Sequence, residues 1–219
     1  MRRPAAAVAV LRRAGPLAAV ALLAGCATTR LPPPQQPATV SWHRRRAVLQ
    51  CLGNWRMRGR MALAARNNGW TADVDWHQHG SRYDLRVSGP FGWGGFRLHG
   101  NPTVVYLDTG GKHYRFLESP EAVIRQQFDM TIPVSGMRYW VLGTWAPGSR
   151  PEHRLDRYGR LSHLVQQGWK IDYQDYTRSS GIMMPSRITM KRSGVRLKLV
   201  VDRWTLTDAG HCRGGSGKG

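Results

Sequence analysis

The sequence first offers metal chemistry at His77-Gln78-His79, where one residue separates two histidines. Side chains two residues apart on a β-strand share a face, so both imidazoles could approach one metal ion. No third ligand stands at the spacing of a zinc motif, and polar strand faces usually carry such histidines as solvated surface. The pair therefore favours a surface role, and we expect no metal and no cofactor.

Catalytic groups are as sparse as metal ligands. The sequence lacks a Gly-x-Ser-x-Gly nucleophile turn, a glycine-rich phosphate loop before a helix, and a His-Glu-x-x-His motif. Acids occur in two close pairs at outward-facing or turn positions, which are Asp73 with Asp75 and Asp172 with Asp175. Hydrolysis by paired acids instead needs them on opposite sides of a cleft. We predict no catalytic residue and no enzyme activity, with a lipid-anchored hydrolase as the weaker alternative.

The thiol of Cys26 carries the clearest chemical signal. It follows Leu23-Ala24-Gly25, and this order matches the lipobox of bacterial lipoproteins, in which the cysteine receives a diacylglycerol. Before it, four arginines precede an uncharged apolar run that is shorter than the roughly 20 residues of a membrane-spanning helix. We therefore predict that residues 1–25 are a removed signal peptide and that Cys26 is the lipid attachment site. The alternative is an ordinary secretory signal with an incidental cysteine.

The rest of the chain divides into a tether, one domain and a tail. Residues 26–40 hold the lipidated cysteine and a proline-rich stretch without apolar periodicity, which predicts a flexible tether. Ala27 stands where an aspartate would favour retention in the inner membrane, so we expect an outer-membrane anchor and a body that faces the periplasm. We predict that residues 41–206 form a single folded domain and that the glycine-rich residues 207–219 form a disordered tail.

Two further cysteines, Cys51 and Cys212, leave one pairing open. The oxidising compartment that a signal peptide implies permits a disulfide between them. The position of Cys212 in the predicted disordered tail argues against that bond, and the sequence does not decide between the two states.

The chain is strongly basic, with a formal net charge of +20 at pH 7. Such an excess invites a nucleic-acid partner, but the positive residues are spread over alternating strands and the predicted compartment holds no nucleic acid. Anionic phospholipid head groups are nearer partners, because basic groups close to an anionic membrane add about 1 kcal/mol each. Coding bias explains the charge equally well, since most of the basic residues are arginine.

Most of the predicted domain alternates between apolar and polar residues, which is typical of antiparallel strands with one buried face. Six strands are expected before residue 118 and five after residue 151, about eleven in all. Their positions are 57–63, 70–76, 83–87, 96–98, 104–106, 114–116, 154–156, 161–166, 169–173, 188–190 and 195–201.

Helical spacing appears in three places. A short helix is expected after Ser41 and ends at Gly53. A capping serine and a proline predict a second helix that begins near Ser119 and runs through Phe128, and a third helix fits residues 134–142. A long run of one-sided strands hides its apolar face by curling into a barrel or half-barrel, and the two later helices fit as a lid.

The interior of such a barrel would be strongly apolar. Its candidate lining residues are Met61, Trp70, Val74, Trp76, Tyr83, Leu85, Trp140 and Trp169. They could fill the barrel as a solid core or surround a cavity for an acyl chain, and the pattern leaves both possibilities open.

The order of these features resembles the LolB family of outer-membrane receptors, which take lipoproteins from the periplasmic chaperone LolA. The resemblance covers nearly the whole predicted mature chain. It depends on Arg58-Gly59-Arg60, Val74-Asp75-Trp76, Tyr83 to Gly92, Ile132-Pro133-Val134, Tyr139 to Gly143, Gly159-Arg160-Leu161, Gln167 to Tyr173, and Met184-Pro185.

The resemblance implies a mainly β protein with a few helices, folded as an unclosed antiparallel β-barrel of about eleven strands under a helical lid. It implies an apolar cavity for lipoprotein acyl chains, a LolA-like chaperone and outer-membrane phospholipid as partners, and no catalytic chemistry. We expect a monomer. A structural lipoprotein that uses the barrel only as a scaffold is the rival function.

The resemblance also points to a membrane-insertion loop. In the family, a Pro-Leu-Gly turn presents an exposed leucine that helps to deliver cargo into the membrane. Here Pro90, Phe91, Gly92 and Trp93 stand at that place, with Phe91 at the position of the leucine. A phenylalanine keeps a large apolar side chain that suits the bilayer interface. The alternative is a turn residue that folds back onto the barrel.

Overall fold

The computed structural model describes residues 38–65, 68–89, 95–148 and 151–214. All of them belong to one compact unit, residues 34–219. No helix in the described ranges is both long enough and apolar enough to cross a membrane.

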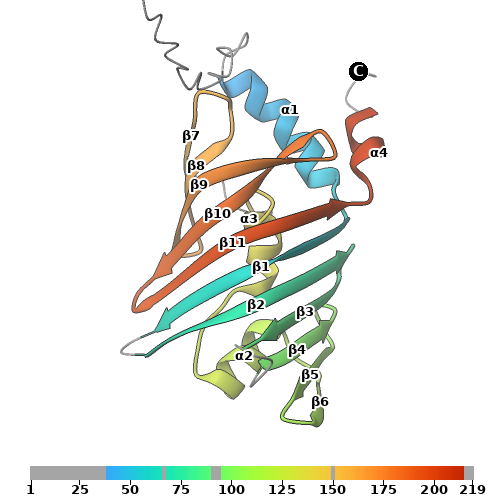
Figure 1. Ribbon diagram of the computed structural model, residues 1–219, viewed down its shortest axis with the longest axis vertical. Helices are drawn as coiled ribbons and strands as arrows, with labels where there is room; N and C mark the ends of the chain where they lie inside the picture. Colours follow the sequence, from blue (N-terminus) through green and yellow to red (C-terminus); the bar gives the residue numbers. More distant parts are fainter. Residues whose placement is uncertain (1–37, 66–67, 90–94, 149–150, 215–219) are drawn as a thin grey trace, which may run out of the picture. The chain divides into compact units, whose positions relative to one another are not determined.

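Two runs of antiparallel strands flank a pair of helices in the chain (Figure 1). The first run is β1 (Asn54–Ala65), β2 (Asn68–His79), β3 (Arg82–Ser88), β4 (Gly95–Gly100), β5 (Val105–Thr109) and β6 (Lys112–Phe116). The second run is β7 (Glu152–Leu155), β8 (Leu161–Gln166), β9 (Trp169–Ser179), β10 (Ile182–Arg192) and β11 (Val195–Leu206). The expected number of strands is therefore confirmed.

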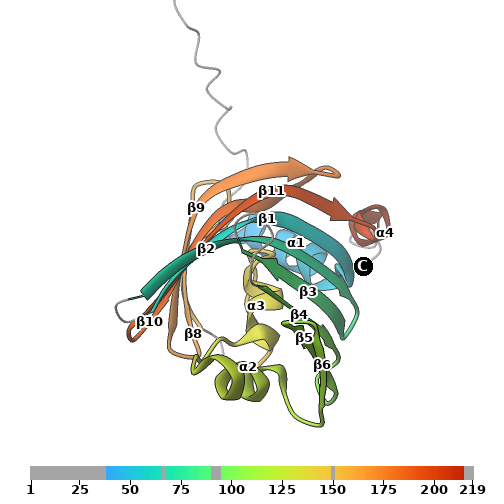
Figure 2. The same ribbon diagram turned by 60° about the horizontal axis from the view of Figure 1, so that its bottom comes forward.

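One eleven-stranded sheet contains both runs, in the order β6-β5-β4-β3-β2-β1-β11-β10-β9-β8-β7. The first and last strands of the chain pair along their length, from Trp55 opposite Leu206 to Ala65 opposite Val195. Consequently β6 and β7 remain as two edges, and the curled sheet does not close into a barrel (Figure 2). The predicted unclosed antiparallel barrel is confirmed.

Gly59 on β1 must be small because the backbone of β11 approaches it closely. The register between β1 and β11 shifts at Arg58/Gly59, and a Cβ on Gly59 would lie 2.2 Å from the carbonyl oxygen of Val200. That approach is to backbone, so no side-chain movement could relieve it. The glycine therefore permits the close contact that joins the two halves of the sheet.

Four helices accompany the sheet: α1 (Ala38–Cys51), α2 (Pro120–Phe128), α3 (Val134–Trp140) and α4 (Ala209–Gly214). At the start of α2, the Ser119 side chain accepts a hydrogen bond from the Ala122 N–H, and Pro120 stands at the first helical position, as the sequence predicts. Helix α2 ends at Asp129, whose φ of 50° is left-handed. Helices α2 and α3 lie on the concave side of the sheet (Figure 2), where a lid was expected.

The predicted tail was wrong for its first residues. Residues 209–214 form α4, and a disulfide joins Cys212 to Cys51 at the end of α1. The glycine content suggested disorder, but the end of β11 brings this segment beside α1, where the bond is possible. Residues 215–219 lie outside the described residues.

The predicted tether was also too long at its C-terminal end. Helix α1 begins at Ala38, so residues 38–40 belong to the helix. Pro37 precedes it in the sequence, and proline is favoured at helix starts. The prediction gave more weight to the capping serine at position 41.

Candidate functional site

An apolar cavity lies between the concave face of the sheet and the two helices of the lid. It is bounded by strands β1 to β4 and β11, by α2 and α3, and by the segments that follow each of these helices. Its lining residues are Met57, Met61, Val74, Trp76, Leu85, Val87, Phe96, Ile124, Ile132, Val134, Met137, Val141, Leu197 and Leu199. None of these residues carries a charge, so the cavity suits a hydrocarbon ligand.

The cavity is narrow in this state. Its volume is about 50 Å³, whereas pockets that hold drug-sized ligands measure roughly 300–1,000 Å³. A long acyl chain therefore requires the walls to separate. Met57, Met61 and Met137 are among the walls, and unbranched methionine side chains rearrange at low cost.

Half of the predicted lining residues reach this cavity. Met61, Val74, Trp76 and Leu85 line it. The cavity does not account for the other four, which are Trp70, Tyr83, Trp140 and Trp169.

Two of those four lie on the rim. Trp70 and Trp169 line a separate groove at the end of the barrel where β1 meets β2. Trp70 is 39% exposed, whereas Trp169 is almost completely buried.

The other two are packed in the protein. Tyr83 is buried without a hydrogen-bond partner for its hydroxyl, and burial raises the pKa of this phenol well above its ordinary value. Trp140, at the end of α3, is fully buried and hydrogen-bonded, which makes it part of the support of the lid.

A buried polar cluster fixes the C-terminal end of α3. The indole N–H of Trp140 donates to Gln166 Oε1 at 2.8 Å, and the same oxygen accepts from the Ala146 N–H at 3.0 Å. Gln166 Nε2 donates in turn to the Ala146 carbonyl at 2.9 Å, and the Tyr173 hydroxyl donates to the Trp140 carbonyl at 2.9 Å. All these groups are satisfied inside the core, so this end of the lid is held against β8 and β9.

The N-terminal half of the lid has fewer polar ties. The Ser135 N–H at the start of α3 donates to Glu121 Oε1 of α2 at 2.7 Å, and this bond is exposed to solvent. Apolar contacts hold the rest, including the ring of Phe128 at 4.9 Å from that of Phe96 on β4. Movement of α2 away from β3 and β4 would therefore break few hydrogen bonds.

The sequence-based list missed ten lining residues for two reasons. Leu197 and Leu199 belong to β11, whose place beside β1 is a long-range pairing. The others are inward positions on strands, on the inner faces of α2 and α3, or in the segments that follow these helices, as Ile132 and Val141 are. Which inward positions face an empty space, and which are packed solid, depends on where the lid rests.

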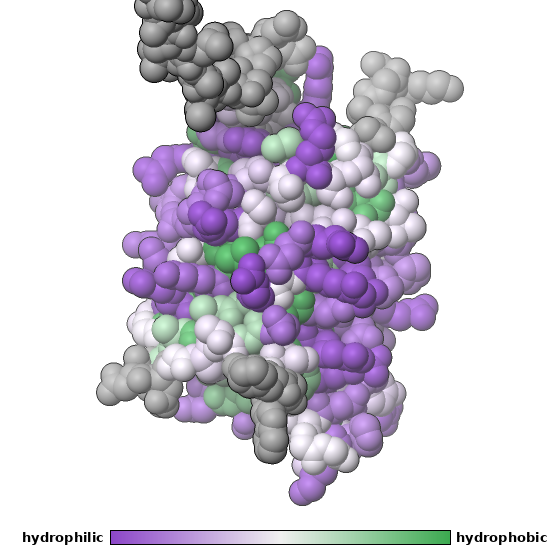
Figure 3. All heavy atoms as spheres, viewed as in Figure 1, coloured by the Kyte–Doolittle hydropathy of each residue, from purple (hydrophilic) through white to green (hydrophobic). Residues whose placement is uncertain are grey.

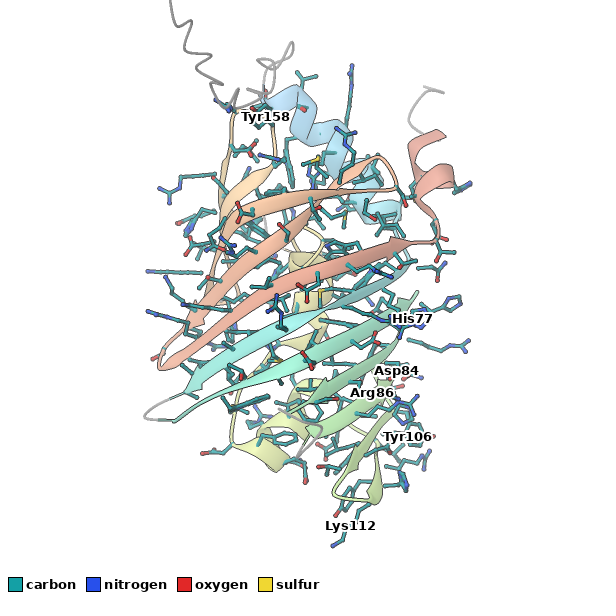
Figure 4. The ribbon with its side chains drawn as sticks, viewed as in Figure 1. His77, Asp84, Arg86, Tyr106, Lys112 and Tyr158 are labelled. Atoms are coloured by element: carbon teal, nitrogen blue, oxygen red, sulfur yellow. A yellow bond between two sulfur atoms is a disulfide. The ribbon has the colours of Figure 1, made fainter. Side chains whose placement is uncertain are left out.

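The outer face of the sheet carries charge and polar groups, as Figure 3 shows. Arg56 donates to Asp75 Oδ1 at 2.7 Å, and this bond holds the pKa of the carboxyl below its ordinary value. Arg97 likewise donates to Asp84 Oδ1 at 2.9 Å, and this bond lowers the pKa of the Asp84 carboxyl. His77 lies opposite Asp84 on the neighbouring strand (Figure 4) and is exposed.

The sequence predicted no metal site, a lipid attachment site and a membrane-insertion loop. The described part of the chain contains no group of three or more His, Cys, Asp or Glu side chains placed to hold a metal ion. Cys26 and the loop residues Pro90, Phe91, Gly92 and Trp93 lie outside the described residues. Their described neighbours, Ser88 at the end of β3 and Gly95 at the start of β4, pair with each other at the same end of the sheet as the paired residues Ala65 and Asn68 of β1 and β2.

Residues 53–204 match the family described as outer membrane lipoprotein LolB. A protein from Chromohalobacter salexigens named outer-membrane lipoprotein LolB is 38% identical over 205 residues, which cover 93% of this chain and 94% of that protein. One of the same name from Nitrosococcus oceani is 36% identical over 191 residues, 87% of this chain and 95% of that protein. A solved LolA superfamily protein from Nitrosomonas europaea gives a TM-score of 0.49 at 11% identity over 79% of this chain and 94% of that chain.

Proposed function

The chain belongs to the LolB family, and from this premise we propose that it is a lipoprotein-sorting protein of the outer membrane. In this proposal it receives the acyl chains of other lipoproteins from a LolA-type periplasmic chaperone. It then releases them into the inner leaflet of the outer membrane. We assign it no catalytic step.

The apolar cavity is the observation that carries the proposal. Fourteen apolar side chains surround it, and the lid is tied by polar contacts mainly at one end. Each methylene that moves from water into such a cavity contributes about 0.8 kcal/mol, whether the cavity belongs to the chaperone or to the receptor. Only the difference between the two cavities sets the direction, so transfer needs no nucleotide.

The membrane end of the proposal includes Cys26 as the lipid attachment site after removal of residues 1–25. It also includes Pro90, Phe91, Gly92 and Trp93 as the loop that enters the leaflet. A chain without the lipid, Cys26→Ala, should still accept cargo, because the lipid supplies location and not the cavity. Phe91→Glu should accept cargo and fail to release it into liposomes, whereas Phe91→Leu should release it normally.

The deciding experiment is a transfer assay with purified components. A LolA-type chaperone loaded with a labelled lipoprotein is mixed with this protein, and the label is followed with and without ATP. We expect transfer at the same rate in both cases. If the barrel were only a scaffold, neither the label nor an apolar fluorescent probe would bind. A requirement for ATP would contradict direct exchange between the cavities.

A further inference from the structure

A second hollow opens at the rim of the half-barrel, beyond the end of the apolar cavity. It has a volume of about 610 Å³. Its walls are the end of β1, the start of β2, the segment after α2, the start of β9, and the turn between β10 and β11. The lining residues are Ala65, Trp70, Phe128, Asp129, Met130, Thr131, Trp169, Arg192, Ser193, Gly194 and Val195. We call this hollow the rim groove.

The rim groove continues the path of the cavity. On β11, Val195 lines the groove and Leu197 lines the cavity. The ring of Phe128 in the groove lies 4.9 Å from the ring of Phe96 in the cavity. A molecule with an acyl chain in the cavity would therefore place its head in the groove.

Two residues that line the groove carry donors without an acceptor among the described residues. Trp169 is 99% buried, and its indole N–H has no hydrogen-bond partner. Arg192 is exposed on the adjoining turn and has no ion-pair partner among the described residues. Its Nε lies 3.5 Å from where a Cβ of Gly168 would stand, which places the guanidinium over the turn that leads into Trp169. A buried donor without an acceptor is costly, about 1–3 kcal/mol, so a ligand oxygen here would be stabilising.

The surroundings of the groove add positive charge. Arg192, Ser193, Gly194 and Val195 also line a neighbouring surface hollow. That hollow includes Lys170, Lys191 and Arg196. Of these three, Lys191 has an acid within reach, Asp172 at 3.6 Å. Asp129 supplies the only carboxylate among the lining residues of the two hollows.

We propose that the rim groove binds the phosphodiester head of a membrane glycerophospholipid, with the acyl chains directed into the apolar cavity. Arg192 and the Trp169 N–H bind the phosphate oxygens, and Trp70, Phe128 and Met130 pack on the glycerol and the first methylenes. The acyl-bearing end of a lipoprotein has no phosphate, so the positive charge favours a phospholipid over that cargo. The apolar half of the groove favours an amphiphile over free phosphate.

Short-chain lipids below their micelle concentration test the groove without a membrane. Residues 26–219 with Cys26→Ala contain the whole compact unit and carry no acyl chain of their own. Calorimetric titration compares dihexanoyl phosphatidylglycerol, dihexanoylglycerol and inorganic phosphate. We expect the phosphate-bearing lipid to bind about tenfold more tightly than the diacylglycerol, as a charge-assisted hydrogen bond implies. Inorganic phosphate should show no saturable binding.

Three variants locate the site. Arg192→Glu should weaken binding of the phospholipid by about tenfold or more and leave diacylglycerol binding unchanged. Trp169→Phe keeps the ring and removes the N–H, and should weaken phospholipid binding by about threefold. Arg203→Glu, an equal charge change at an exposed position of β11 away from the groove, should have less than about a twofold effect.

Several results would overturn the proposal. They are equal affinity for the two lipids, an equal loss in Arg192→Glu and Arg203→Glu, or inorganic phosphate binding as tightly as the lipid. The experiment contains neither a chaperone nor a lipoprotein. A negative result in the lipid titration would therefore not contradict the proposed transfer function. A negative result in the transfer assay would likewise not contradict phospholipid binding in the rim groove.

Discussion

The two sides of the half-barrel have the same strand pattern and different interiors. On the side of β8 to β10, inward residues such as Leu164, Ile171 and Ile188 are fully buried. On the side of β1 to β4, inward residues such as Val74 and Leu85 line a cavity. We call these the filled side and the hollow side.

Polar contacts follow this division. The filled side holds the Gln166 cluster, and on β10 the Pro185 carbonyl accepts a hydrogen bond from the Trp204 indole N–H at 2.8 Å. Among the described residues, the lining of the hollow side has one buried polar contact nearby, in which Trp76 Nε1 donates to Gln78 Oε1 at 3.1 Å. Directional bonds fix one geometry, whereas apolar contacts tolerate several. The filled side therefore acts as a rigid base, and the hollow side is free to widen.

Gln166→Leu should produce the largest effect, because it attacks the rigid base. It leaves the Trp140 N–H and both backbone groups of Ala146 without partners in the core. We expect the free energy of unfolding to fall by about 3–5 kcal/mol, since each orphaned group costs roughly 1–3 kcal/mol. Chemical denaturation measures this change.

The matched control is Gln127→Leu, at an exposed position of α2 where the glutamine side chain makes no hydrogen bond among the described residues. It should change the free energy of unfolding by less than about 0.5 kcal/mol. Equal losses in the two variants would mean that the filled side is not held by its polar cluster.

The disulfide should come next in size. It ties the end of α1 to α4 across 161 residues of sequence, and α1 packs on the filled side through Arg45, which donates to the Met183 carbonyl. Loss of the bond in the double variant Cys51→Ala, Cys212→Ala should lower the free energy of unfolding by about 2–4 kcal/mol. Binding of an apolar probe should stay unchanged, because the cavity is on the other side. A reductant should destabilise the parent and leave the double variant unaffected. If the reductant left the stability of the parent unchanged, the bond would not be formed in the parent.

Val74→Phe tests the hollow side directly. The larger ring would occupy the narrow cavity, so binding of an acyl probe should weaken by about tenfold, while overpacking costs about 1–2 kcal/mol of stability. Val200→Phe on the partly exposed outer face of β11 is the control and should leave binding unchanged. Displacement of a fluorescent fatty acid gives both affinities. Undiminished binding in Val74→Phe would place the acyl site elsewhere.

The strands could be predicted from the sequence because each has one face in water and one face buried. Polar and apolar residues therefore alternate along each strand. The sequence did not separate the two sides, because Trp76 and Trp169 are both inward positions of their strands, yet Trp76 lines the cavity and Trp169 lies beside Trp140 at the end of α3. The pairing of β1 with β11 and the bond between Cys51 and Cys212 both join distant parts of the chain. Such contacts depend on how the two halves of the sheet come together, for which no local pattern exists.

Asp75→Asn, on the outer face of the hollow side, should produce the smallest effect. Asp75 accepts from Arg56 and also from Arg58, yet all three side chains are partly exposed. Solvent weakens such pairs to about 0.2–1 kcal/mol. The Arg56 bond lowers the pKa of Asp75 in the folded protein. Its stabilisation is therefore present above the unfolded value of about 3.9 and is lost as the pH falls through the folded pKa.

The parent protein and the Asp75→Asn variant should consequently differ slightly in free energy of unfolding at pH 7 and converge as the pH falls below the lowered pKa of Asp75. Asp73→Asn, on the same face of β2, serves as the control and should show no such convergence, because no ion pair is formed by Asp73 among the described residues. A difference that persisted in acid would have to come from packing and not from charge. The outer face of the sheet would then help to fix the conformation of the hollow side. The difference in rigidity between the filled side and the hollow side would be smaller than the buried contacts suggest.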